Sequence, residues 1–272
     1  MQTHIAQTTP PRARGRAALS SKVVNGRSVL ADLHQSGAFK VVFPRADDGL
    51  RPILLNTAGG VTGGDRFALD VDVAANTHVS LTTQAAERAY RAQPGEIGHI
   101  RTVAKVHGRG CLHWLPQELI LYNGCAMERR LGIDLSAEAQ LLMVEPIIFG
   151  RAAMGETLTE GHFRDRIEIT RAGRPLYRDA LRLEDDIAAK LARVGTAQGA
   201  AAMASGLYVA PNAEAVLEAV RHHLGDWGGA SLLAPDVLAL RLIATDSHIL
   251  RQHLLPVLDL LSQSTLPISW RL

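Results

Sequence analysis

Apolar and polar residues alternate along much of the first two thirds of the chain. Residues 67–73 place Phe, Leu or Val at every second position, with Ala or Asp between them. Because successive side chains of a strand point to opposite faces, this period of two predicts a half-buried β-strand. Residues 77–83, 99–107 and 127–135 follow the same pattern less strictly, so we expect a strand in each.

Residues 141–149 differ because they are apolar at nearly every position. Such a run predicts a central strand covered on both faces, although a buried helix has the same composition. Upstream, Gly108 and Gly110 allow a tight reversal of the chain into the apolar residues 112–122.

Strand-like segments continue to about residue 184. Residues 163–170 and 176–183 flank the turn-forming residues 172–175 and predict a hairpin. About a dozen strands and no convincing long helix are expected before this point, by the spacing of the turn signals. The pattern is typical of an all-β region.

The C-terminal third has a more helical pattern. We predict helices over residues 213–224 and 247–261, and Pro256 predicts a kink in the second. A strand is expected at residues 237–244. Residues 185–194 and 196–205 favour helix or irregular structure.

These segments together predict a mainly β fold, a layered antiparallel β-sheet architecture with a helical pair packed on it. No linker composition divides the chain, so residues 1–272 are expected to form a single domain. Residues 1–31 are basic and lack Asp and Glu, and Pro10 and Pro11 oppose an early helix. We expect residues 1–20 to form a flexible arm.

Composition narrows the class of protein. Hydrophobic residues make up 47% of the 272 residues and charged residues 21%, which is typical of a globular protein with a sizeable core. The net charge of +2 gives no broad attraction to nucleic acid or anionic lipid. Two cysteines exclude a cystine-stapled scaffold, and no apolar signal core or spanning segment is found. A cytoplasmic location without membrane association is expected.

Familiar catalytic motifs are missing from the sequence. The glycine-rich residues 56–65 lack the Gly-Lys-Ser/Thr of a phosphate loop and precede a strand, so a glycine-dependent turn is favoured over nucleotide binding. Neither Gly-x-Ser-x-Gly nor His-Glu-x-x-His occurs. Cys111, His113 and Cys125 are soft metal ligands in type, but no fourth ligand follows at zinc-site spacing, so buried thiols are favoured.

Several carboxylates stand beside glycine or proline, where they ordinarily accept backbone hydrogen bonds. They are Asp65, Glu118, Glu145 and Glu156. The alternative is that they converge on a polar path for a cation, since oxygen ligands hold divalent metals loosely enough to release them. Sequence spacing alone leaves both alternatives open.

Four ordered blocks resemble the urease accessory protein family UreD, called UreH in some systems. They are residues 56–65 (NTAGGVTGGD), 82–91 (TTQAAERAYR), 114–122 (WLPQELILY) and 149–156 (FGRAAMGE). The resemblance extends over about residues 50–185.

The resemblance implies a non-enzymatic nickel metallochaperone that assembles with UreF and the GTPase UreG on apo-urease and aids nickel insertion. It also implies a layered β fold and a water-filled internal tunnel for nickel, with no tightly bound cofactor. On this chain the expected residues of a transient nickel path are Asp65 and Glu156, followed by Glu118 and Glu87. Asp65→Ala is expected to lower urease activation while leaving folding intact.

Two other classes of function compete with this one. The first is a β-rich carbohydrate-active or carbohydrate-binding protein that uses Asp65, Glu118 and Glu156. Glycosidase chemistry requires two carboxyl groups facing one cleft, roughly 5 to 9.5 Å apart. The second is an interaction module that never contacts metal.

Overall fold

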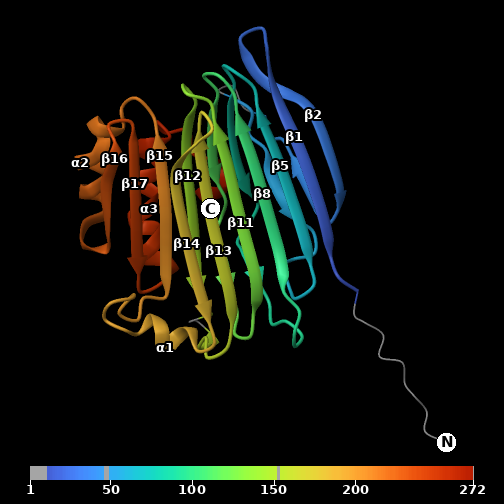
Figure 1. The fold of residues 1–272 in the computed structure, drawn as a ribbon, viewed down its shortest axis with the longest axis vertical. Helices are drawn as coiled ribbons and strands as arrows, with labels where there is room; N and C mark the ends of the chain where they lie inside the picture. The colour runs from blue at the N-terminus through green and yellow to red at the C-terminus, as the bar shows by residue number, and fades with distance from the viewer. Residues whose placement is uncertain (1–10, 46–48, 152–153, 272) are drawn as a thin grey trace, which may run out of the picture.

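The chain folds into two facing β-sheets with helices against one of them (Figure 1). The computed structural model describes residues 11–45, 49–151 and 154–271. The content is 52% strand and 15% helix, which confirms the mainly β prediction. None of the helices in these ranges is long and apolar enough to cross a membrane.

The described strands form a seven-stranded sheet, here sheet A, and a ten-stranded sheet, here sheet B. Across sheet A the order is β14 (Arg174–Glu184), β13 (His162–Arg171), β11 (Ala126–Leu135), β8 (Gly98–Val106), β5 (Arg66–Val73), β1 (Arg14–Val24) and β2 (Arg27–Gly37). Across sheet B it is β16 (Gly228–Ala234), β17 (Val237–Ala244), β15 (Ala202–Val209), β12 (Gln140–Phe149), β9 (Cys111–Leu115), β6 (His78–Thr83), β4 (Ile53–Asn56) and β3 (Phe39–Val42). Off this path, β10 (Leu119–Leu121) pairs with β12 and with β7 (Glu87–Ala89).

The middle of both sheets is parallel, so the prediction of an antiparallel architecture is wrong there. The chain alternates between the sheets, as in β8, β9, β11 and β12, and forms a β-solenoid of about 4 turns. Strands one turn apart therefore lie side by side in the same direction, as β5, β8, β11 and β13 do in sheet A. Antiparallel pairing is found toward the edges, in β1–β2, β13–β14 and β15–β17.

The turn after β8 shows why the pattern misled. Gly108 has a φ of +50°, and the amide of Gly110 donates to the carbonyl of His107, so the chain does turn tightly here. The turn leads to β9 in sheet B, not back along β8. A hairpin and a crossing between sheets need the same turn-forming residues, and the alternation of side chains is the same in both.

Strand β12 is buried at eight of its ten positions, which confirms that residues 141–149 form a doubly covered strand. Side chains at odd positions of β12 join the core between the sheets. Side chains at even positions, such as Leu142 and Val144, join a second core between sheet B and the helices.

The predicted helical pair is confirmed with its bounds. Helices α2 (Ala213–Leu224) and α3 (Ser247–Leu261) pack on β15, β16 and β17, where their apolar stripes close the second core. The Asp246 side chain caps α3 by accepting from the Ile249 amide at 2.9 Å. Shorter helices are α1 (Ile187–Leu191), η2 (Gly225–Trp227) and η3 (Ile268–Trp270).

Three further regions differ from the sequence analysis. Residues 202–205, expected to be helical or irregular, lie in the buried strand β15. No strand was expected at residues 228–234, which form β16. The predicted arm over residues 1–20 is wrong for residues 14–20, which lie in β1, while residues 1–10 lie outside the described ranges.

Candidate functional site

Three cavities follow one another, the first lined by strands and loops of sheet B and the other two lying between sheets A and B, and we call them the inter-sheet row. Their volumes are about 200, 60 and 10 Å³. Thr83 and Glu87 line both the first and the second, and Glu145 lines both the second and the third. The row therefore extends from the β4–β7 side of the molecule to the β14–β17 side.

Glu87 lies where the first two cavities meet. Its carboxylate oxygens accept hydrogen bonds from Nδ2 of Asn56 at 3.1 and 3.3 Å and from the Arg88 amide at 3.2 Å. Burial raises the pKa of Glu87, and the hydrogen bond from Asn56 opposes the rise. The residue is a half-buried carboxylate with a neutral partner, which leaves it able to contact a cation.

A buried charged triad lies in the middle of the row. Arg129 on β11 donates two hydrogen bonds to Asp165 on β13, at 3.0 and 2.6 Å, and Nη1 lies 2.5 Å from Oε2 of Glu145 on β12. The indole of Trp114 donates to the other Glu145 oxygen at 2.6 Å. All three charged residues occupy inward positions of their strands, where apolar side chains otherwise form the core.

Burial sets the electrostatics of this triad. It would lower the pKa of Arg129, but Asp165 and Glu145 hold that pKa above its ordinary value. For Glu145, burial raises the pKa despite Arg129 and Trp114. The triad therefore contains two carboxylates and one guanidinium, and burial disfavours the charged form of Glu145.

Asp179 and Arg241 line the third cavity and form an ion pair between β14 and β17. The Arg241 side chain is 50% exposed, so this end of the row reaches the surface. The described residues that line the row include four carboxylates and four guanidiniums. They are Glu87, Glu145, Asp165 and Asp179, and Arg88, Arg129, Arg130 and Arg241. Such balance disfavours a tight cation cage and suits weak, oxygen-based contacts.

Comparison with known proteins identifies the family. The family model described as UreD urease accessory protein matches residues 13–271. The chain is 53% identical over 262 residues to a protein of Roseobacter denitrificans, with 96% of each covered. It is 52% identical over 253 residues to one of Ruegeria pomeroyi, covering 93% of this chain and 98% of that protein. Identity to a protein of Rhizobium leguminosarum bv. viciae is 42% over 275 residues, with both fully covered. All three relatives are named urease accessory protein UreD.

The chain belongs to the UreD family. This membership confirms the resemblance seen in the four sequence blocks. The first of those blocks ends at Asp65, one of the four residues predicted to line a nickel path. Asp65 is buried, and its two oxygens accept from the amides of Ala13 at 2.7 Å and Thr62 at 2.9 Å. These bonds join the N-terminal segment to the glycine-rich loop.

Two other predicted path residues of this UreD chain also lie outside the row. Glu118 is buried and pairs with Arg251 of α3 at 2.8 Å. Glu156 accepts two hydrogen bonds from the Arg151 guanidinium, at 3.0 and 2.9 Å, and these bonds lower its pKa. It lines a separate open hollow with Tyr90 and other residues. Of the four, Glu87 is the residue that lines the inter-sheet row.

The cysteines separate in the structure. Cys111 and His113 lie on β9, and His78 lies on the neighbouring strand β6. One ligand atom from each of the three residues lies within 4.8 Å of the other two. Cys125 is buried in the core between the sheets, away from this group. Sequence spacing brings Cys111 and His113 together but does not point to His78, although His78 lies on the polar side of residues 77–83.

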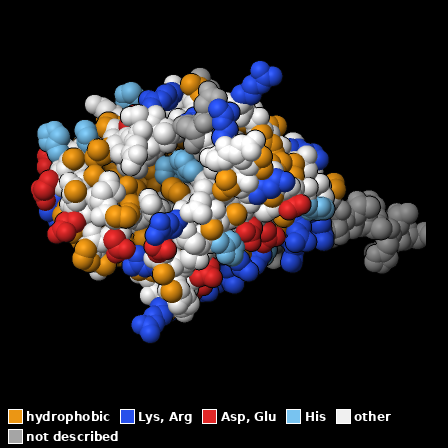
Figure 2. Space-filling model, turned by 90° about the horizontal axis from the view of Figure 1, so that it is seen from above, with side chains coloured by type: hydrophobic (Ala, Val, Ile, Leu, Met, Phe, Trp, Pro, Cys, Tyr) orange, Lys and Arg blue, Asp and Glu red, His pale blue; other side chains and the backbone are white. Residues whose placement is uncertain are grey.

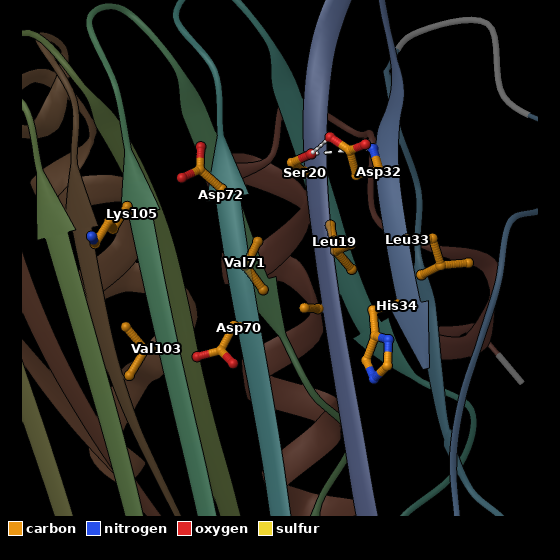
Figure 3. A pocket seen from close by; sticks show the side chains of 11 residues that line it. Leu19, Ser20, Asp32, Leu33, His34, Asp70, Val71, Asp72, Val103 and Lys105 are labelled. Atoms are coloured by element: carbon orange, nitrogen blue, oxygen red, sulfur yellow. Dashed lines mark hydrogen bonds between the residues drawn. The ribbon is translucent and has the colours of Figure 1, made fainter. Parts of the chain in front are cut away.

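A shallow hollow of about 430 Å³ lies on the outer face of sheet A (Figure 3). Asp70 and Asp72 of β5 line it and turn toward Lys105 and Val103 of β8, while His34 of β2 lines it on the far side of β1. Asp70 already pairs with exposed arginines, and Asp72 pairs with His107. Because these carboxylates are already paired, we assign the hollow to an ordinary solvated surface. Figure 2 shows the molecule from above, where acidic and basic side chains are also mixed.

Proposed function

We propose that nickel passes through the inter-sheet row on its way to urease. As a member of the UreD family, the chain acts in urease maturation and nickel insertion, as a non-catalytic scaffold. The observation that carries the proposal is the position of Glu87, a half-buried carboxylate shared by two consecutive cavities.

The chemistry of the row supports transfer over storage. Carboxylate oxygens hold divalent ions more loosely than thiolates do, and the arginines along the row oppose a long stay of any cation. The second carboxylate along the row, Glu145, is already paired with Arg129. An ion at Glu145 therefore competes with a guanidinium, which keeps its binding weak.

The third cavity is too small for an ion to pass without movement of side chains. Its volume of about 10 Å³ is at the lower limit for one water molecule. A hydrated ion needs more room, so side chains have to move at this end. Arg241 is the residue most able to do so, because half of its side chain is exposed and its partner Asp179 lies at the rim.

The partners proposed for this chain are UreF, UreG and the apo-urease subunits, in a cytoplasmic assembly. Family membership supports work with urease maturation partners. The apolar stripes of α2 and α3 cover sheet B, so these stripes are not available to UreF. Nickel contact by Asp65, Glu118 and Glu156 stays a prediction, and all three already have protein partners.

The carbohydrate-active alternative receives no support from the geometry. Asp65 caps backbone amides, Glu118 faces α3, and Glu156 pairs with Arg151 in an open hollow. None of the five cavities described above is lined by two of these three residues.

The test measures the nickel content of urease that has matured in cells with the complete set of accessory proteins. In these cells this chain carries the substitution Glu87→Gln. Glutamine keeps the size of the side chain and a carbonyl acceptor for Asn56 but removes the charge that attracts nickel. We expect the nickel content of purified urease to fall several-fold. Glu138→Gln is the matched control, since it removes an exposed carboxylate that is outside the row and is not predicted to contact nickel, and we expect unchanged nickel content.

Equal nickel content of urease with Glu87→Gln and with the parent chain would contradict the proposal that nickel passes through the row. The amount of accessory complex on urease is measured in the same cells, because a lost complex would lower nickel content for another reason.

A further inference from the structure

His78, Cys111 and His113 lie on the face of sheet B that points away from the inter-sheet row. In β6 and β9 the neighbouring residues Val79 and Leu112 enter the core between the sheets, so the alternation of strands sends these three outward. Register pairs His78 with Cys111 and Ser80 with His113. The group is therefore separate from the row described above.

The distances within the group suit a metal ion. Nε2 of His78 lies 3.3 Å from Nδ1 of His113, in a hydrogen bond that a bound ion would replace, and the Cys111 sulfur lies within 4.8 Å of a ring nitrogen of each histidine. A tetrahedral ion bound at about 2.0–2.1 Å holds two nitrogen ligands roughly 3.3 Å apart and a nitrogen and a sulfur roughly 3.6 Å apart. The two imidazoles are thus already spaced for coordination, and the thiol has to move by little more than about 1 Å.

A second observation comes from Ser80. This side chain is 3% exposed, and its hydroxyl has no hydrogen-bond partner among the described residues. It lies directly across from His113 in the strand register. Buried hydroxyls are almost always paired, so an unpaired one beside three ligand atoms points to a bound species.

The charge of Arg51 acts on His113 and opposes a cation at this site. An incoming ion displaces the thiol proton of Cys111, and the charge of the thiolate that forms offsets the charge of Arg51.

We propose that His78, Cys111 and His113 bind one divalent ion of the borderline type, Ni²⁺ or Zn²⁺, on the outer face of sheet B. Imidazole and thiolate select these ions over Mg²⁺ and Ca²⁺. Three protein ligands leave a fourth position for water or for the Ser80 hydroxyl. This inference stands independently of the proposed nickel route, because none of the three residues lines the row.

The experiment titrates Ni²⁺, and separately Zn²⁺, into the metal-free full-length chain. Binding of one Ni²⁺ to a thiolate gives a ligand-to-metal charge-transfer band in the ultraviolet. Zn²⁺ gives no such band but displaces Ni²⁺, and the two titrations show which ion binds more tightly. We expect Cys111→Ser to abolish the band and to weaken Ni²⁺ binding at least about tenfold.

Cys125→Ser is the matched control, since it removes the second thiol of the chain, which is buried in the core between the sheets. We expect this variant, and Glu87→Gln in the row, to keep the band at full strength. His78→Gln, at a half-buried position, gives a second test if Cys111→Ser does not fold, and should weaken Ni²⁺ binding at least about tenfold. A parent chain without the band, or a band lost in Cys125→Ser and kept in Cys111→Ser, would overturn the site.

Discussion

The two faces of sheet B are made by the same strands but carry different side chains. On β12, Glu145 points toward sheet A, while Leu142 and Val144 point toward the helices. Under α2 and α3 the sheet is packed with Leu, Ala and Val. Toward sheet A, the same strand places a buried carboxylate against Arg129.

The two faces of sheet B differ in what their side chains are needed for. An apolar face is sufficient to hold the helices, because burial of aliphatic side chains is favourable without any partner. Buried charges lose hydration, and well-packed apolar residues are often at least as stable in their place. We infer that the charges between the sheets are kept for what they contact, not for the stability of the fold.

The largest expected effect comes from breaking the buried triad. Arg129→Met leaves Glu145 and Asp165 unpaired between the sheets, so we expect a loss of about 3–5 kcal/mol in the free energy of unfolding. Urea denaturation measures it. Adding Glu145→Gln and Asp165→Asn to the same chain should restore much of the loss, because the stranded charges are then gone.

The control for that variant is an exposed pair of the same chemistry. Arg109 and Glu138 pair at 3.1 Å with side chains 72% and 63% exposed. Arg109→Ala should therefore change stability by no more than about 1 kcal/mol. Similar losses in Arg129→Met and Arg109→Ala would contradict the difference drawn between buried and exposed charge.

The apolar face is tested by Leu254→Ala in α3. Leu254 is fully buried in the core between sheet B and the helices. Removal of its side chain should cost about 2–5 kcal/mol, from lost burial and the cavity that remains. Because no titratable group is removed, the loss should be the same at pH 5 and pH 8. A loss that varies strongly with pH would show that the two faces are coupled.

The pH dependence of stability tests the inner face. Since burial raises the pKa of Glu145 above the ordinary 4.5, folding favours its neutral form. Its contribution to stability is therefore largest below pH 4.5 and is lost as the pH rises through the higher folded-state value. The stability of the parent relative to Glu145→Gln should fall by at most about 1.4 kcal/mol per pH unit. A relative stability that rises with pH would mean that Arg129 dominates instead.

The smallest effect is expected at the N-terminus of α3. Asp246→Ala removes the side chain that accepts from the Ile249 amide. Loss of this cap should lower the unfolding free energy by about 1 kcal/mol. Asp246→Asn, which keeps the acceptor, should retain most of it, and equal losses in both variants would assign the effect to charge.

The fold was predictable where the determinants are local. The apolar residues 141–149 predict β12, and the periodic residues 213–224 and 247–261 predict the helices with their bounds. The parallel order was not predictable, because a period of two is common to parallel and antiparallel strands. Which strand lies beside which is decided by crossings such as the one after Gly108.

The site was predictable only in part. The family resemblance predicts Glu87, and Glu145 stands out in the sequence as a carboxylate before proline. A lone charge inside an otherwise apolar strand was the stronger signal at Glu145, because such a residue has to be buried with a partner. Arg129 gave no such signal, since it stands beside Arg130 in a strand whose other face is polar.

The most direct test of the nickel route is anomalous scattering at the nickel edge from crystals of the chain soaked in Ni²⁺. We expect a peak between the two sheets beside the Glu87 carboxylate, absent from crystals of Glu87→Gln. A further peak at His78, Cys111 and His113 is compatible with this result. Peaks confined to the outside of the sheets, with none between them, would contradict the route.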